Sequence, residues 1–74
     1  MDTSQVEKVV EQVEGGCHLS MSEMRDTIDA VMEGRFGDDH IARFLLGLNR
    51  KGPTVAEVAG AAAAMRKHLS LIHI

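Results

Sequence analysis

Apolar residues recur near the start of the chain with the spacing of a helix that buries one face. Four valines follow the i, i+3, i+4, i+7 rule of an amphipathic helix: Val6, Val9, Val10 and Val13. The pattern predicts a first helix from residue 3 to residue 14, opened by Thr3 or Ser4 and stopped at Gly15-Gly16. Because valine is a mediocre helix former, packing against the remaining elements is expected to hold this segment in place.

The second apolar segment follows a clear start signal. Ser20 and Glu23 are spaced as a capping box, and Leu19 and Met24 are placed as the hydrophobic staple around it. A second helix is therefore predicted from Met21 to Glu33, ended by the glycine that follows. Its expected buried residues are Met24, Ile28, Val31 and Met32.

The third apolar segment is wider than the others. Asp38 can cap a helix that runs to Gly52. At about 100° per residue, its apolar positions sweep roughly 200° of the circumference. A helix apolar over more than half its girth needs neighbours on two sides, and in so short a chain one of them can be another chain or a further domain. The candidate interface therefore consists of Ile41, Phe44, Leu45, Leu46 and Leu48.

The fourth segment carries small residues. Thr54 and Glu57 form a second capping box, with Pro53 and Val58 as the staple pair, and the helix is expected to reach at least His68. Its larger apolar residues form a narrow ridge: Val55, Val58, Met65 and Leu69. The alanines and glycine between Ala59 and Ala64 cover most of the remaining surface, which favours close packing against another element over a bare surface helix.

Together these patterns predict the fold class. Four helices, short loops punctuated by glycine and no strand indicate a small all-α bundle. A chain of 74 residues forms one domain at most and is marginally stable unless it is assembled with a partner. The helical domain is assigned to residues 1–68.

Composition and charge exclude several classes of function. The net charge is −3, and there is no Trp or Tyr and only two Phe, which disfavours nucleic-acid binding, including by a helix-turn-helix. The two basic pairs, Arg50-Lys51 and Arg66-Lys67, are interpreted as complements to helix C-termini. A single cysteine, no signal peptide and no apolar run of membrane-spanning length predict a cytoplasmic protein without a membrane partner.

Candidate chemistry is sparse. Cys17, His18, His40, His68 and His73 make no metal-binding spacing, and a reactive thiol at Cys17 is only a minor alternative. The carboxylates of the first two helices are interpreted as solvated surface, and Asp38-Asp39 as helix capping. The segment "GRFGDD" lacks the spacing of a phosphate loop. No catalytic, cofactor-binding or metal-binding residue is therefore assigned.

The segment "GRFGDDHIARFLLGLNRKGPTVAEVAGAAAAMRKH" resembles the N-terminal helical domain of the anthranilate phosphoribosyltransferase family. Shared positions include Phe44-Leu45-Leu46, Lys51-Gly52, Thr54, Ala59-Gly60-Ala61 and Ala64-Met65-Arg66. The preceding "GCHLSMSEMRDTIDAVMEG" also fits, so the resemblance covers about residues 5 to 68. Asp39-His40 and Asn49 depart from the pattern. The tail "LSLIHI" matches nothing in the family and is a candidate for a non-native end.

This resemblance implies a parent enzyme that uses magnesium to transfer the phosphoribosyl group of phosphoribosyl pyrophosphate to anthranilate in tryptophan biosynthesis. In the family, the phosphate loop and the metal carboxylates lie in an α/β domain that this sequence lacks. The resemblance therefore implies that the chain alone is inactive and needs no cofactor itself. It also implies that the helical domain supplies homodimer contacts and one wall of the cleft between the domains.

Two alternatives stay open. Pyrimidine nucleoside phosphorylases share the helical domain, but "KGPT" and "AGAAAAMR" favour the transferase. The wide apolar arc of the third helix also suits a freestanding helical module that binds another protein.

Overall fold

The computed structural model describes residues 2–72, with side chains up to Leu69. These residues form four helices and no strand: α1 (Thr3–Glu14), α2 (Met21–Met32), α3 (Asp38–Lys51) and α4 (Val55–Ile72). The predicted all-α bundle is confirmed, and α4 passes His68 as expected. The last two residues of the predicted tail lie outside the described residues.

The helix starts agree with the sequence prediction at two places out of four. Ser20 and Glu23 form the predicted capping box at α2, and Thr54 and Glu57 form it at α4. At α1 the prediction of Thr3 or Ser4 is wrong, because Asp2 is the cap and accepts a hydrogen bond from the Gln5 amide at 2.9 Å.

At α3 the prediction that Asp38 is the cap is also wrong. Gly37 is the N-cap, without a side-chain hydrogen bond, and Asp38 and Asp39 already lie in the first helical turn. Their charges still complement the helix dipole there.

The helix ends are set by glycines with positive φ. Gly16 and Gly34 have φ of 86° and 78°, a region that side-chain-bearing residues rarely adopt. At the end of α1, the Gly16 amide donates to the Val13 carbonyl and the Cys17 amide to the Gln12 carbonyl, which is the paired pattern of a Schellman motif. These turns satisfy the last carbonyls of the helix and redirect the chain.

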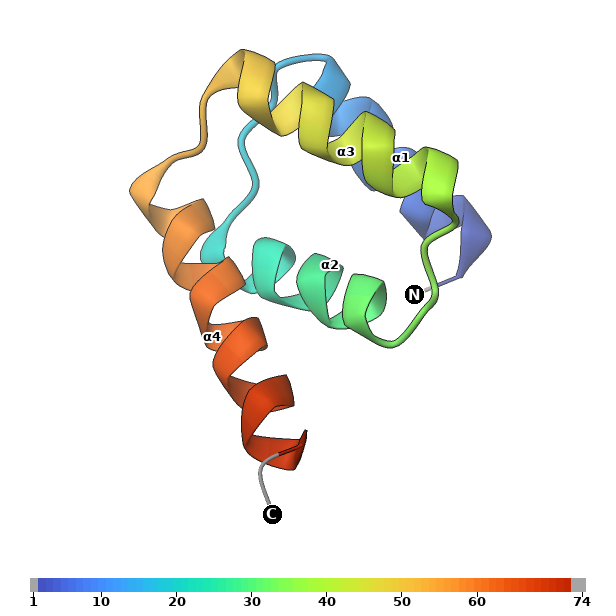
Figure 1. Cartoon of the computed structure of the whole chain (residues 1–74). Helices are drawn as coiled ribbons and strands as arrows, with labels where there is room; N and C mark the ends of the chain where they lie inside the picture. Colours follow the sequence, from blue (N-terminus) through green and yellow to red (C-terminus); the bar gives the residue numbers. More distant parts are fainter. Residues whose placement is uncertain (1, 73–74) are drawn as a thin grey trace.

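The helices pair alternately along the chain. In Figure 1, α1 lies beside α3, and α2 lies beside α4, so that neither pair consists of neighbours in sequence. Each pair meets at a glycine. A Cβ on Gly47 would lie 3.1 Å from Val13 Cγ1, and a Cβ on Gly60 would overlap the Met21 carbonyl oxygen. The predicted close packing of the small-residue helix is therefore confirmed on the side of α4 that faces α2.

The hydrophobic core lies between the two pairs and draws on α1, α2, α3, the α1–α2 linker and the α2–α3 linker. Its buried members are Val6, Val10, Val13, Leu19, Met24, Ala30, Phe36 and Phe44. The rings of Phe36 and Phe44 meet edge to face, with centroids 6.1 Å apart. Leu19 and Met24, the predicted staple pair, both belong to this core.

One prediction of burial is wrong, because Met32 is 42% exposed. The predicted staple pair is not part of the core either, since Val58 is 56% exposed and Pro53 is exposed. The cause lies in the rotation of α4. Its small residues Gly60 and Ala64, together with Glu57, face inward, which turns the larger apolar ridge outward.

Candidate functional site

An apolar groove lies where α2, α3 and α4 meet. Its volume is about 380 Å³, and all of its lining residues are apolar. They are Ile28, Val31, Met32, Ile41, Phe44, Leu45, Met65 and Leu69. The groove has no polar group to orient a small molecule, so its chemistry is that of a surface for another apolar side chain.

The five candidate interface residues of α3 divide among three environments. Phe44 is 1% exposed and belongs to the core, while Ile41 and Leu48 are half-buried against it. Leu45 and Leu46 are 55% and 65% exposed. The wide arc therefore covers both a core face and an open face, and the role of the open face as an interface stays a prediction.

A second apolar surface follows the outer side of α4. Val55, Val58, Met65 and Leu69 are between 47% and 88% exposed. Met65 and Leu69 also line the groove, so the two surfaces are continuous.

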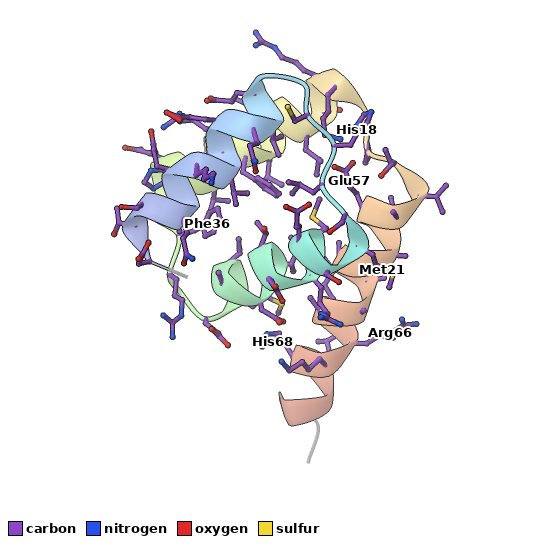
Figure 2. All side chains as sticks on the ribbon, turned by 180° about the vertical axis from the view of Figure 1, so that it is seen from behind. His18, Met21, Phe36, Glu57, Arg66 and His68 are labelled. Atoms are coloured by element: carbon purple, nitrogen blue, oxygen red, sulfur yellow. The ribbon has the colours of Figure 1, made fainter. Side chains whose placement is uncertain are left out.

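The most buried charged group is an ion pair behind the start of α4. Lys51 Nζ lies 2.5 Å from Glu57 Oε1, and the two side chains are 4% and 0% exposed. Glu57 also accepts hydrogen bonds from the Leu19 amide at 2.6 Å and the Thr54 amide at 2.8 Å. Figure 2 shows Glu57 directed toward the linker that carries His18.

These contacts decide the protonation of Glu57. Burial by itself raises the pKa of the carboxyl group. The hydrogen bonds from the Leu19 amide, the Lys51 ammonium and the Thr54 amide outweigh it and lower the pKa to about 2. The carboxylate is therefore charged near neutral pH and joins the α1–α2 linker, the end of α3 and the start of α4.

The sequence identified only part of this network. The predicted capping box at Glu57 is confirmed, whereas the spacing of Lys51 indicates only a complement to the helix dipole. The spacing of a capping box says nothing of burial, so the ion pair and its link to Leu19, 38 residues away, were missed.

A second charge cluster joins α1 to α3. Arg43 contacts Glu7 at 3.2 Å and Glu14 at 2.8 Å, and His40 Nε2 lies 2.7 Å from Glu7. Hydrogen bonds from His40 and then Arg43 lower the pKa of Glu7, and the bond from Arg43 lowers the pKa of Glu14. The predicted surface position of Glu7 and Glu14 is confirmed, since both side chains are accessible to solvent, and the structure adds their ion pairs with Arg43.

A related contact joins α2 to α4. Asp29, which is 17% exposed, lies 3.0 Å from His68 Nε2 and 3.6 Å from Lys67 Nζ. The Arg66-Lys67 pair does not mark a helix end as predicted, because α4 continues to Ile72. The Arg50-Lys51 pair does lie in the last turn of α3.

A polar cleft of about 560 Å³ separates α1 from α2. Lys8, Gln5 and Gln12 line it from α1, and carboxylates of α2, among them Asp26 and Asp29, line it from the other side. Within residues 2–72, no group of three His, Cys, Asp or Glu side chains is arranged to hold a metal ion. His73 lies outside the described residues, and Cys17 is exposed in the linker.

No helix within the described part of the chain is long and apolar enough to cross a membrane.

The sequence of this helical bundle belongs to a defined class of protein. Residues 7–69 match the helical bundle domain of the glycosyl transferase family, and the chain belongs to that family. Anthranilate phosphoribosyltransferases are among its curated relatives. The protein of Geotalea daltonii is 39% identical over 93% of this chain, and that of Geotalea uraniireducens is 41% identical over the same share. The protein of Rhodopirellula baltica is 41% identical over 78% of this chain.

The chain is much shorter than these relatives. It spans 17% to 20% of the length of the three proteins named. No solved structure matches the chain.

Proposed function

We propose that this chain is the N-terminal helical domain of an anthranilate phosphoribosyltransferase. The parent enzyme transfers the phosphoribosyl group from phosphoribosyl pyrophosphate to anthranilate, a step of tryptophan biosynthesis. The observation that carries the proposal is identity of about 40% over nearly the whole chain with relatives five times as long.

In this proposal the chain supplies a scaffold, and the missing α/β domain supplies the chemistry. Transfer of a phosphoribosyl group requires amides, cations and a metal ion fixed around a pyrophosphate. The apolar groove between α2, α3 and α4 has no polar lining, which suits contact with protein better than contact with such a substrate. Magnesium would accordingly be held by residues of the α/β domain.

The partners follow from the open apolar surfaces. We infer that the helical domain forms a homodimer and one wall of the cleft next to the α/β domain. Leu45 and Leu46 of α3 and the outer face of α4 support this, since together they expose more apolar surface than isolated residues would. A cytoplasmic location without nucleic-acid partners is proposed from the single exposed Cys17 and the net negative charge.

The experiment is to sequence the gene beyond Arg66 and to assay two proteins, the full-length gene product and the 74-residue chain. The full-length product is expected to consume anthranilate, followed by its fluorescence, when phosphoribosyl pyrophosphate and magnesium are present. The 74-residue chain is expected to show no turnover under the same conditions. A gene that encodes no α/β domain, or turnover by the short chain, would falsify the proposal.

The exposed apolar surface also supports a second candidate, a freestanding helical module that binds another protein. An in-frame stop in the gene close to residue 74 would favour that candidate over the enzyme domain.

A further inference from the structure

The Lys51 ammonium group has an acceptor for each of its three hydrogens. Besides Glu57 Oε1 at 2.5 Å, Lys51 Nζ lies 3.2 Å from the Gly52 carbonyl oxygen and 3.1 Å from His18 Nδ1. An ammonium group has three N–H donors and no acceptor. The third acceptor is therefore a ring nitrogen of the α1–α2 linker, on a residue that is exposed to solvent.

This contact requires a neutral imidazole at His18. Hydrogen bonds hold the pKa of Glu57 at about 2, so both this carboxylate and its counter-ion Lys51 are charged near neutral pH. A ring nitrogen accepts a hydrogen bond only when it carries no hydrogen, which places the hydrogen of His18 on Nε2. A protonated imidazole donates from both nitrogens, so turning the ring over does not restore the bond.

The α1–α2 linker contacts both members of the ion pair through two consecutive residues. The His18 ring accepts from Lys51 of α3, and the Leu19 amide donates to Glu57 Oε2 of α4 at 2.6 Å. Figure 2 shows His18 and Glu57 next to each other at this linker. Leu19 is 4% exposed, whereas His18 is accessible to protons from solution without any opening of the core.

The charges around His18 differ from those around the other described histidines. His40 and His68 face carboxylates, those of Glu7 and Asp29. Among the described side chains, no carboxylate lies within ion-pairing distance of the His18 ring. The charged group in contact with the ring is the Lys51 ammonium from α3, which also engages Glu57 from α4, and on the linker itself the neighbouring titratable group is the exposed Cys17.

Protonation of His18 therefore has the opposite consequence from protonation of His40 or His68. It removes the acceptor of the Lys51 hydrogen bond and places one cation beside another. Histidine is the side chain whose charge ordinarily changes between about pH 5 and about pH 8.

We propose that His18 is a pH-sensitive switch on the α1–α2 linker. The neutral ring holds the linker to the buried ion pair, and the protonated ring leaves it in mild acid and admits water to Lys51 and Glu57. The change is local, because it breaks one side-chain contact at the surface and leaves the core residues packed. It goes beyond the proposed function and does not depend on it.

Hydrogen exchange at the Leu19 amide tests the switch in the 74-residue chain. NMR measures the protection of this amide, relative to an unstructured chain at the same pH, at about pH 7.5 and about pH 5.5. Protection is expected to fall about fivefold at the lower pH, the size of one lost hydrogen bond. The Arg35 amide, which donates to the Ala30 carbonyl in the α2–α3 linker, should keep its protection.

His18→Gln is the matched variant. The amide oxygen of glutamine can accept a hydrogen bond from Lys51 at either pH, and glutamine does not titrate. In this variant, protection of the Leu19 amide should be the same at both pH values. His40→Gln removes a different histidine and should leave the fall at Leu19 unchanged.

Three results would overturn the switch. An equal fall in the parent chain and in His18→Gln would assign the change to another group. Constant protection of Leu19 in the parent chain would show that the His18 contact does not hold the linker. An equal fall at Arg35 would show a general loosening of the fold rather than a local release.

Discussion

Lys51 and Glu57 form a buried ion pair that links three segments of this small chain. Both are removed from water, and the carboxylate also accepts two backbone hydrogen bonds. Charged residues are almost never fully buried unless paired, so each of these side chains depends on the other. The sequence allowed the capping role of Glu57 to be predicted, because capping is local. It did not allow the role of Lys51 to be predicted, because that requires the packing of Leu19 over the pair.

Glu57→Gln is expected to destabilise the protein by about 3 kcal/mol, because it leaves the buried Lys51 ammonium without its counter-charge. Urea unfolding followed by circular dichroism measures the change. Glu11→Gln alters an exposed carboxylate on α1 and should stay within about 0.5 kcal/mol of the parent chain. Equal effects for the two variants would contradict the role given to the ion pair.

At the scale of the helix, the ends were predictable and the starts only partly so. A glycine after an apolar periodic segment is a strong signal of a helix end. Gly16, Gly34 and Gly52 each follow a helix and have positive φ. The start of α1 was ambiguous because Asp2, Thr3 and Ser4 can all cap a helix. Ser4 and Glu7 even have the spacing of a capping box, but Glu7 instead contacts His40 and Arg43 of α3. The contact of Glu7 with α3 therefore bears on which residue caps α1.

Caps that carry a side-chain hydrogen bond should matter more than acidic residues inside the first turn. Ser20→Ala is expected to cost about 1 kcal/mol, since it removes the bond to the Glu23 amide. Asp38→Ala removes only a favourable interaction with the helix dipole and should cost less than about half as much. Thermal unfolding of the two variants compares them, and a larger loss for Asp38→Ala would restore its predicted capping role.

The glycines between paired helices should respond differently from ordinary helical glycines. In an open helix, Gly→Ala stabilises by about 0.5 to 1 kcal/mol. At Gly60 we expect the opposite sign, a loss of about 1 to 3 kcal/mol, because the new methyl group overlaps the Met21 carbonyl of α2. Gly47→Ala should cost less, since its methyl group meets the movable side chain of Val13 at 3.1 Å as well as the Glu14 amide. Urea midpoints that rank the two in reverse order would contradict this.

At the scale of the whole molecule, the class of fold was predicted and the arrangement was not. Helix number and approximate length follow from periodicity and punctuation within about twenty residues. Which helices pair depends on contacts between residues 33 to 39 positions apart, such as Glu7 with His40 and Asp29 with His68. The groove requires three helices to be placed at once. The wide apolar arc of α3 therefore indicates that the helix faces both the core and an open surface. It does not indicate which of its residues face the core and which are exposed.

Acid should unfold the molecule through its paired carboxylates. Glu7, Glu14 and Glu57 have folded-state pKa values below their ordinary value of 4.5, and that of Glu57 falls to about 2. In this range the unfolded chain binds more protons than the folded chain, so stability decreases as the pH falls from about 4.5 toward 2. Urea midpoints between pH 7 and pH 2 measure the loss. The slope should be shallower in Glu57→Gln, and an unchanged slope would assign the acid sensitivity to other groups.

The alternation of helix pairs has a consequence for how the chain comes into being. During synthesis α1 and α2 leave the ribosome before their packing partners, because α1 packs against α3 and α2 packs against α4. The first half of the chain therefore leaves the exit tunnel with two apolar stripes and nothing of its own to cover them. Folding must be nearly all-or-none, with a higher contact order than a bundle of simple hairpins and a slower rate to match. A protein cut between α2 and α3 would separate every pair, and neither piece would keep the fold.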